Sequence, residues 1–347
     1  MRFLILINGG GRGMEFELKS RSFRNCCSTS CFILFRERHN ASQELSSIAE
    51  HWSIDPMTQM ETKALGMSGI QVPAMALGTW QYQGGIEPLR AGIDLGVTFI
   101  DTAESYGTEE VVGQAIRGIR EKVFVATKAS PRHFRGSDLI TAVEKSLKRL
   151  NTDYVDLYQL HWPNYCVPIE ETMSAMERLV ASSKVRFIGL SNFSPREVQQ
   201  AQSCLASNFI VSDQVRYSLV DRTIEDELLP FCRTKQISVL AFSPLDTGIQ
   251  NFRQFDEEDV LGHVARHVGK SPVQVALNWC LCQEPVVVIV KANTIEHVQE
   301  NCGAAGWRLE PGAWKALNQI RFRRRCPLER FARRMARRIL QRVGRNV

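Results

Sequence analysis

Four polar side chains follow apolar stretches of the chain and could together move a proton. Asp101 comes directly after residues 97–100, and Tyr106 stands five residues further on. Lys128 and His161 come at the ends of two later apolar runs. Singly, each has an ordinary explanation, on the surface or in packing. As a set they are harder to explain, because charged groups at such positions need partners when they are buried.

The four side chains suit general acid catalysis. A free tyrosine, with a pKa of about 10, is a poor proton donor at neutral pH. An adjacent ammonium favours the phenolate, so Lys128 is expected to lower the pKa of Tyr106. Asp101 would keep Lys128 charged and fix its position, and His161 would hydrogen-bond and orient a carbonyl oxygen. Such a set predicts proton donation to an oxygen that gains negative charge, as in hydride addition to a carbonyl.

Short β-rich runs alternate with helical segments from about residue 67 onward. Apolar residues at positions i, i+3 and i+4 give the intervening segments, such as 139–150 and 169–180, one apolar face each. The eight predicted strands are residues 72–77, 97–100, 123–126, 154–160, 185–190, 209–215, 237–242 and 286–290. Such alternation indicates parallel strands, and eight units over residues 67–320 predict an α/β fold, the (β/α)8 or TIM barrel.

Two helix starts support this assignment. Ser194-Pro195 followed by Glu197 predicts a capping box with proline at the first helical position, and Ser271-Pro272 opens another helix in the same way. A barrel of this kind collects its catalytic groups where the carboxyl ends of its strands converge, so the four polar residues are expected there. Further polar residues end the fifth and sixth predicted strands: Ser191, Asn192 and Gln214.

The chain divides into three segments. Residues 1–60 show no sustained periodicity and are expected to be a poorly ordered extension. Residues 61–320 are expected to form the barrel as a single domain, and residues 321–347 an arginine-rich tail. The glycine-rich run 9–13 lacks the strand, turn and helix of a dinucleotide-binding loop, so a Rossmann fold is rejected.

The positive charge of the chain is concentrated in its tail. Eleven arginines against one acid give residues 321–347 a net charge of +10, whereas the whole chain carries +6, so the remainder carries −4. Apolar residues recur at helical spacing in the tail and predict a basic amphipathic helix: Leu328, Phe331, Met335, Ile339 and Val343. Such a helix could lie on an anionic membrane or on nucleic acid. A solvated appendage is the favoured interpretation, and no nucleic-acid partner is expected because the body is acidic.

The composition indicates a soluble, cytoplasmic protein. With 347 residues and 44% hydrophobic content, the chain can bury a full core. Its longest apolar runs, such as 3–7 and 286–290, are far shorter than the roughly 20 residues of a membrane span, and the first is too short for a signal peptide. Without an export signal, the ten cysteines are expected to be free thiols. Cys26, Cys27 and Cys31 lack a second pair of ligands at zinc-finger spacing, so no metal is expected.

Several motifs, in their order and spacing, resemble the aldo-keto reductase family. They are Gly96-x4-Asp101-Thr-Ala-x2-Tyr106-Gly107, Lys128, Leu160-His161-Trp162-Pro163 and Gly189-Leu-Ser191-Asn192-Phe. The resemblance covers residues of about 67 to 319. It implies NADPH-dependent reduction of a small aldehyde or ketone, with Asp101, Tyr106, Lys128 and His161 as the catalytic tetrad and Tyr106 as the general acid. A monomer is expected.

The resemblance also implies a set of residues that bind the cofactor. Ser191, Asn192 and Gln214 would hold the nicotinamide carboxamide, whose amide needs both donors and acceptors. Lys291 would meet the 2′-phosphate, with His297 where the family leads one to expect arginine. The full set is Thr79, Trp80, Asp101, Ser191, Asn192, Gln214, Phe242, Ser243, Leu245, Lys291, His297, Glu300 and Asn301, of which Glu300 and Asn301 would meet the adenine.

Two residues near the seventh predicted strand depart from the family pattern. Phe242 stands where tyrosine is common, and stacking on the nicotinamide survives that change because the ring face does the stacking. Asp246 stands where many relatives carry glycine. A carboxylate close to two phosphates would repel them unless it turns outward. The sequence therefore leaves two alternatives for the loop after the seventh predicted strand, closed over the cofactor or not.

The substrate is not identified by the sequence. The residues expected to contact it are Trp80, Tyr82, Tyr106, His161 and Trp162, and their aromatic rings would admit many aldehydes and ketones. Two alternatives remain. The chain could be a cofactor-binding regulatory or redox-sensing subunit with little turnover, although the complete tetrad argues against this. It could also be a peripheral membrane or nucleic-acid binder through its basic tail, although the acidic body argues against that.

Overall fold

The computed structural model describes residues 60–322 and 335–336. The predicted extension, the cysteine cluster within it and nearly all of the arginine-rich tail lie outside the described residues. None of the helices in the described part is long and apolar enough to cross a membrane.

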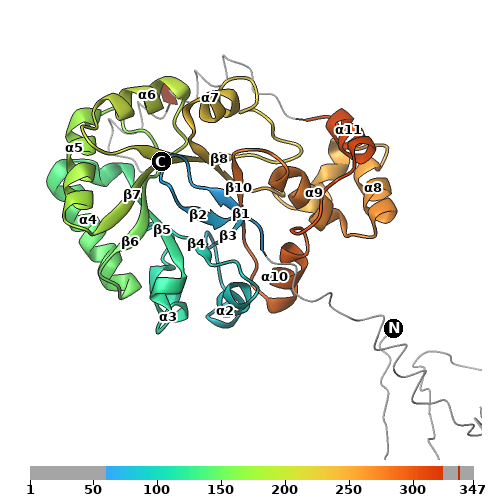
Figure 1. Ribbon diagram of the computed structural model, residues 1–347, viewed down its shortest axis with the longest axis horizontal. Coiled ribbons are helices and arrows are strands. Elements are labelled where there is room, and N and C mark those ends of the chain that lie inside the picture. The colour runs from blue at the N-terminus through green and yellow to red at the C-terminus, as the bar shows by residue number, and fades with distance from the viewer. Residues whose placement is uncertain (1–59, 323–334, 337–347) are drawn as a thin grey trace, which may run out of the picture. The chain divides into compact units, whose positions relative to one another are not determined.

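Eight parallel strands close into a barrel, which confirms the predicted fold (Figure 1). The strands are β3 (Met75–Gly78), β4 (Phe99–Asp101), β5 (Phe124–Ala129), β6 (Val155–Leu160), β7 (Val185–Ser191), β8 (Ile210–Arg216), β9 (Ser238–Phe242) and β10 (Val286–Val290). The last strand closes the barrel because Val288 pairs with Met75 of β3 on one side and with Ala241 of β9 on the other. Each predicted strand therefore has its counterpart in the barrel.

Helices surround the strands (Figure 1). They are α2 (Glu87–Asp94), α3 (Glu109–Ala115), α4 (Gly136–Leu150), α5 (Ile169–Ala181), α6 (Pro195–Ser203), α7 (Leu228–Lys235), α8 (Val260–Val268), α9 (Pro272–Leu281), α10 (Ile295–Cys302) and α11 (Pro311–Gln319). Both predicted helix starts are confirmed as capping boxes, with Ser194 and Glu197 at α6 and Ser271 and Gln274 at α9. Short 3-10 helices lie at Arg120–Lys122, Pro131–His133 and Ile249–Gln254.

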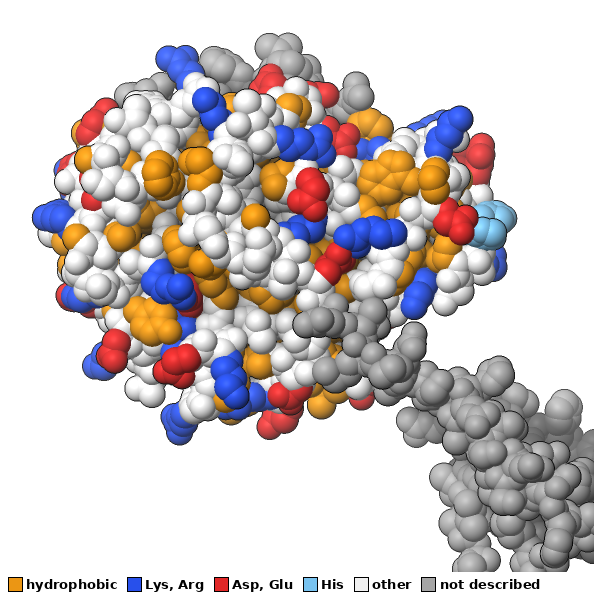
Figure 2. Space-filling view, in the orientation of Figure 1, with side chains coloured by type: hydrophobic (Ala, Val, Ile, Leu, Met, Phe, Trp, Pro, Cys, Tyr) orange, Lys and Arg blue, Asp and Glu red, His pale blue; other side chains and the backbone are white. Residues whose placement is uncertain are grey.

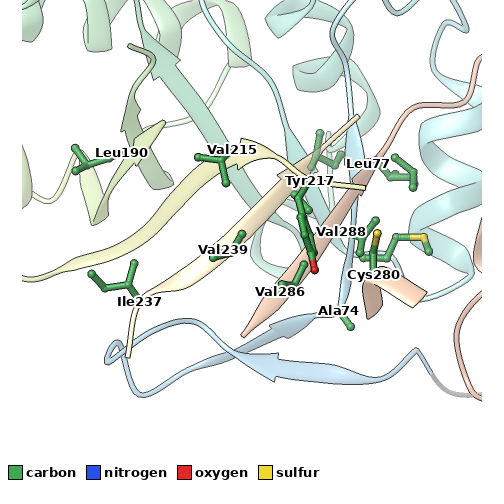
Figure 3. Packing of buried hydrophobic residues seen from close by; sticks show 14 of the residues in the cluster. Ala74, Leu77, Leu190, Val215, Tyr217, Ile237, Val239, Cys280, Val286 and Val288 are labelled. Carbon is green, nitrogen blue, oxygen red and sulfur yellow. The ribbon is translucent and has the colours of Figure 1, made fainter. Parts of the chain in front are cut away.

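Two apolar clusters stabilise the barrel. The larger lies between the strands and the helices, and Figure 3 shows part of it, with Val239 on β9, Val286 and Val288 on β10 and Cys280 on α9. The smaller contains residues of the strands alone and of the segment before them: Leu65, Val72, Ala76, Phe99, Ala126, Leu157, Val211, Leu240, Val287 and Ile289. Burying one such large side chain contributes about 1.5–3 kcal/mol, so the strands are held in place from both faces.

A β-hairpin that the sequence did not predict precedes the barrel. Strands β1 (Thr62–Ala64) and β2 (Gln71–Pro73) pair antiparallel, and Ala74 separates β2 from β3. The predicted strand 72–77 therefore merged two strands that belong to different sheets. The run looked continuous because it is apolar throughout, although Pro73, the last residue of β2, marks the junction.

The hairpin contacts the amino-terminal end of the barrel. The hydroxyl of Ser238, the first residue of β9, accepts a hydrogen bond from the Gly66 backbone at 2.8 Å and donates one to the Ala64 carbonyl at 2.9 Å. Gly66 has a φ of +53°, and a Cβ there would lie 2.4 Å from the Val211 carbonyl oxygen, so only glycine fits. With this end covered, the carboxyl end of the barrel is left for ligands.

The packing of the barrel continues past α11. Ile320 is buried, and the guanidinium of Arg222 lies 4.6 Å from the ring centroids of both Phe322 and Trp279. Arg222 also donates to the Leu317 carbonyl at 3.0 Å, at the end of α11. These contacts reach two residues beyond the predicted boundary at residue 320. The dispensability of the remaining tail stays a prediction.

The described surface carries both signs of charge. Figure 2 shows lysine and arginine interspersed with aspartate and glutamate over one face of the barrel. This mixture fits a body whose net charge, without the tail, is negative. The six cysteines in the described part are free thiols, as predicted: Cys166, Cys204, Cys232, Cys280, Cys282 and Cys302.

Candidate active site

The four predicted catalytic residues lie at the carboxyl ends of neighbouring strands. Asp101 is the last residue of β4, Lys128 is the penultimate residue of β5, and His161 directly follows β6. Tyr106 stands in the loop between β4 and α3. Because β4, β5 and β6 are adjacent in the barrel, the fold brings these residues together at one end.

Lys128 and Asp101 form a buried ion pair. Lys128 Nζ lies 2.6 Å from Asp101 Oδ2 and donates to the Thr102 carbonyl at 2.7 Å. The lysine side chain is fully buried and that of Asp101 is 4% exposed. Burial alone would lower the pKa of Lys128, but Asp101 and then Tyr106 outweigh it, so the net shift is upward. Lys128 is therefore an ammonium at neutral pH.

Tyr106 contacts both His161 and Lys128. Its hydroxyl is 3.4 Å from His161 Nε2, and Lys128 Nζ is 4.8 Å from the centroid of the Tyr106 ring. Burial raises the pKa of Tyr106, and the opposing effect of Lys128 is smaller. The prediction that Lys128 lowers the pKa of Tyr106 was therefore wrong. Burial destabilises the phenolate more than the nearby ammonium stabilises it. Tyr106 consequently holds its proton at neutral pH.

His161 is neutral. Burial, followed by the charge of Lys128, lowers its pKa to about 3. A neutral imidazole can still form hydrogen bonds through either ring nitrogen, according to its tautomer. The side chain can therefore orient an oxygen without adding a second positive charge beside Lys128.

Two glutamine amides complete the environment of Asp101. Its Oδ1 accepts from Gln214 Nε2 at 2.8 Å and from Gln159 Nε2 at 3.2 Å. Gln159 Oε1 in turn lies 3.2 Å from Gln214 Nε2. Gln159 was missed by the sequence analysis, although a signal existed. It is a polar residue near the carboxyl end of β6, two positions before His161, and alternate residues of an extended chain point to the same side.

The residues predicted to hold a carboxamide are gathered beside the tetrad. Ser191 Oγ donates to the Gln214 carbonyl at 2.9 Å. Asn192 Nδ2 donates to Ser191 Oγ at 2.9 Å and to the His161 carbonyl at 3.2 Å. Because Gln214 also reaches Asp101, one hydrogen-bonded network joins β4, β6, β7 and β8 at this end of the barrel.

The residues that follow β3 have different environments. Thr79 is fully buried, and its hydroxyl donates to the Asp101 carbonyl at 3.1 Å. Trp80 is 57% exposed, so its ring is available to a ligand. Tyr82 is 8% exposed and its hydroxyl donates to the Gly85 carbonyl at 2.9 Å, which leaves this predicted substrate residue little free surface. Trp162, which directly follows His161, is partly buried.

The loop after β9 carries the predicted stacking residue and the unexpected acid. Phe242 is the last residue of β9, and Leu245 packs against the larger apolar cluster, between the strands and the helices. Asp246 has a side chain only 1% exposed, and its Oδ1 lies 2.8 Å from Arg216 Nη1. The carboxylate that was expected to repel phosphates is thus paired with an arginine. Arg216 was not considered in the sequence analysis, because nothing in a single sequence links positions 216 and 246.

Two candidate residues for the 2′-phosphate lie between the end of β10 and the first turn of α10. Lys291 directly follows β10, and both it and His297 are exposed. The Thr294 hydroxyl accepts from the His297 backbone at 3.3 Å and caps the helix. Glu300 Oε1, by contrast, accepts from Ser271 Oγ at 2.9 Å, so this carboxylate already binds the N-cap residue of α9. Asn301 is buried.

Comparison with known proteins agrees with this geometry. Residues 74–321 match the Aldo/keto reductase family. The chain is 42% identical over 253 residues to the methylglyoxal reductase YeaE of Escherichia coli (strain K12), covering 70% of this chain and 89% of the relative.

Solved structures give the same result. A thermostable aldo-keto reductase, Tm1743, in complex with the inhibitor epalrestat, shares 40% identity at a TM-score of 0.70, covering 75% of this chain and 99% of the other. An aldo/keto reductase from Klebsiella pneumoniae in complex with NADP and acetate shares 38% identity at a TM-score of 0.70, covering 76% and 96%. The matched residues include all eight strands of the barrel, and the chain therefore belongs to the aldo/keto reductase family, as an oxidoreductase that acts on carbonyl groups.

Proposed function

We propose that this protein reduces aldehydes or ketones to alcohols with NADPH, and that Tyr106 is the general acid. The observation that carries the proposal is the position of the Tyr106 hydroxyl, 3.4 Å from His161 Nε2 and beside an ammonium that Asp101 holds at 2.6 Å. A proton donor, a neutral hydrogen-bonding group and a fixed positive charge converge on one point. This is the arrangement that stabilises an oxygen as it gains negative charge.

The residues at the carboxyl end of the barrel fit NADPH by their chemistry. Ser191, Asn192 and Gln214 offer amide and hydroxyl groups suited to a carboxamide. Lys291, just before the capped helix α10, and His297, in its first turn, suit the 2′-phosphate, because helix starts favour anions. When bound, the dihydronicotinamide supplies the hydride that adds to the carbonyl carbon. The NADP bound in the Klebsiella pneumoniae relative supports this choice of cofactor.

The tetrad handles the proton. Tyr106 holds it at neutral pH because burial raises the pKa of its hydroxyl. As the carbonyl oxygen gains charge, that oxygen becomes basic enough to take the proton from Tyr106. The Lys128 ammonium stabilises the phenolate left behind, and Asp101 keeps the lysine in place. His161, being neutral, orients the carbonyl oxygen without competing for the proton.

The substitution Tyr106→Phe tests the assignment. It should lower kcat by about 100-fold or more, since general acid catalysis contributes at least that much, while NADPH binding stays nearly unchanged. Tyr158→Phe is the matched control, because Tyr158 is fully buried and its hydroxyl has no hydrogen-bond partner among the described residues. If Tyr106→Phe keeps more than about a tenth of the wild-type kcat, Tyr106 is not the acid.

A panel of carbonyl compounds tests the substrate class. The exposed ring of Trp80, which follows Thr79 and its bond to the Asp101 carbonyl, favours small, partly apolar aldehydes, ketones and dicarbonyls. The methylglyoxal reductase relative makes methylglyoxal the first to try. Loss of NADPH absorbance should follow addition of at least one of them. Tight NADPH binding with no turnover on any compound would instead favour the regulatory, redox-sensing role. We propose a cytoplasmic monomer, which gel filtration and cell fractionation can test.

A further inference from the structure

An ion pair joins β8 to the loop that follows β9. Arg216 is the last residue of β8, and Asp246 lies four residues after Phe242, the last residue of β9. Arg216 Nη1 donates to Asp246 Oδ1 at 2.8 Å. The aspartate side chain is 1% exposed and the arginine side chain 27%. The carboxylate is therefore held under the surface, with the guanidinium as its cation.

The loop has a backbone that suits glycine better than aspartate. Ser243 and Asp246 have φ values of +51° and +54°, in the left-handed region that other residues seldom adopt. Two tight turns follow each other, with Asp246 N bonded to Ser243 O and Gly248 N to Leu245 O, both at 2.9 Å. An aspartate at such a position carries a conformational cost. The hydrogen-bonded pair with Arg216 offsets that cost.

Arg216 contacts both ends of this short segment. Its guanidinium carbon lies 5.9 Å from the centroid of the Phe242 ring, and the two residues are register partners in the β8–β9 pairing. The arginine thus binds Asp246 through its charge and faces Phe242 with its planar group. Residues 242–246 are fixed at their beginning by the strand and at their end by the ion pair.

The segment lies where a barrel binds phosphate groups. β9 and β10 are the seventh and eighth strands of the barrel in chain order, and the loops after these two strands commonly form a phosphate site at the carboxyl end. Gln214 of β8, which bonds to the catalytic Asp101, is two residues before Arg216. The ion pair is therefore placed between the catalytic network and the expected position of the cofactor phosphates.

We propose that Arg216 and Asp246 are a positioning pair for the cofactor: Arg216 fixes segment 242–246 and neutralises the Asp246 carboxylate beside the phosphate groups. This inference rests on the proposed use of NADPH. Asp246 is then tolerated where a bare carboxylate would repel the cofactor, because the guanidinium compensates its charge at 2.8 Å. The pair acts on binding and release of the cofactor, and leaves the proton-transfer chemistry at Tyr106 unchanged.

The charges predict unequal effects of removing each partner. Arg216→Leu takes away the cation and leaves a buried negative charge near the phosphates, so it combines loss of loop fixation with repulsion. Asp246→Gly leaves the cation and relieves the backbone, so only the fixation is lost. The double variant removes the repulsion that Arg216→Leu alone creates. From tightest to weakest NADPH binding, the expected order is wild type, Asp246→Gly, the double variant and then Arg216→Leu.

The experiment is a double-mutant cycle read out by NADPH binding. Fluorescence titration gives Kd, and stopped-flow mixing gives the dissociation rate. Arg216→Leu should raise Kd by about tenfold or more, which corresponds to losing one charge-assisted hydrogen bond, and Asp246→Gly should raise it by about threefold or less. The double variant should bind NADPH more tightly than Arg216→Leu. Most of each change should lie in the dissociation rate.

Further measurements separate positioning from general loss of structure. Hydrogen exchange of residues 243–248 without cofactor should accelerate in Arg216→Leu, and Arg216→Lys should restore part of the affinity. At saturating NADPH, the KM for the carbonyl should stay within about threefold of wild type. Arg266→Leu is the matched control: the Arg266–Asp259 pair is exposed at 64% and 63%, and Asp259 also has a positive φ of +52°. That variant should leave NADPH binding unchanged.

Two results would overturn the proposal. One is an equal loss of affinity in Arg216→Leu and Asp246→Gly, and the other is a double variant that binds no better than Arg216→Leu. If Arg216→Leu does not fold, Asp246→Gly and Arg216→Lys still test the loop through its exchange rate and the NADPH dissociation rate. Failure of the proposed function looks different, because wild type itself would then bind no NADPH or reduce no carbonyl.

Discussion

The two ends of the proposed cofactor site are built in opposite ways. At the catalytic end, Asp101 and Lys128 are buried and each makes several hydrogen bonds. At the α10 end, Lys291 and His297 are exposed to solvent. Buried, mutually bonded groups keep their geometry without a ligand, whereas exposed cations act mainly through their charge. We therefore expect the catalytic end to determine the chemistry, and the α10 end to adjust which cofactor binds and how tightly.

Removing the negative charge of the buried pair should have the largest effect. In Asp101→Asn the amide cannot neutralise Lys128, and burial then lowers the pKa of the lysine, the direction that Asp101 opposes in wild type. The kcat should fall by about 100-fold and decline further as the pH rises, because the ammonium that stabilises the phenolate is lost. A pH profile of kcat between 6 and 10, at saturating NADPH, measures this.

Asp101→Asn should also lower the free energy of unfolding. The wild-type pKa of Lys128 is raised above the ordinary value, so the ion pair stabilises the fold at neutral pH and is lost only as the pH rises through the raised pKa. Breaking a buried pair costs about 3–5 kcal/mol, and urea unfolding should show a loss of that order. A flat pH profile together with unchanged stability in Asp101→Asn would mean that the buried pair does not organise this end.

Gln159 offers a smaller perturbation of the same network. In Gln159→Leu, Asp101 loses one of its two amide donors and Gln214 loses its 3.2 Å contact, but the ion pair remains. Losing one hydrogen bond of this kind costs about 1–3 kcal/mol, so kcat/KM should fall by roughly tenfold. Steady-state kinetics at several NADPH concentrations test this. Tyr158→Phe, one residue earlier on the same strand, is the control. Equal kinetics in the two variants would remove Gln159 from the network.

The sequence predicted most of the fold and the gathering of the tetrad. Strand and helix periodicity is local, and a parallel barrel brings strand ends together whatever the side chains are, so Asp101, Lys128 and His161 could be placed without coordinates. The hairpin before the barrel was missed because residues 72–77 form one apolar run. Its division at Ala74 depends on tertiary pairing with other strands.

The energetics were less accessible than the positions. Burial raises the pKa of Tyr106 although an ammonium is near. The direction of this shift depends on the balance between burial and charge, which the spacing of residues in the sequence does not reveal. The Arg216–Asp246 pair spans 30 residues and joins the end of β8 to the loop after β9. A single sequence contains no signal for such a contact. Asp246 could be singled out as unusual, but its partner could be found only in three dimensions.

The smallest expected effect is at the exposed end, in the variant His297→Arg. A 2′-phosphate is nearly dianionic at neutral pH, and Lys291 would provide one fixed positive charge beside it. Histidine adds a second charge only when it is protonated, whereas arginine adds one at every pH and can bind the phosphate through two hydrogen bonds. His297→Arg should therefore tighten NADPH binding by about threefold to tenfold and should leave NADH nearly unchanged.

Direct titration of NADPH and NADH against wild type and His297→Arg distinguishes the explanations. His267→Arg, an exposed histidine on α8, controls for a general increase in positive charge, and it should change neither cofactor. Added salt should reduce the gain in His297→Arg, because the charges at this end are exposed and screened, but should hardly affect the buried pair at the other end. If wild type binds NADH and NADPH equally, the start of α10 does not contact the 2′-phosphate. The contrast between a rigid catalytic end and a charge-tuned cofactor end would then have to be given up.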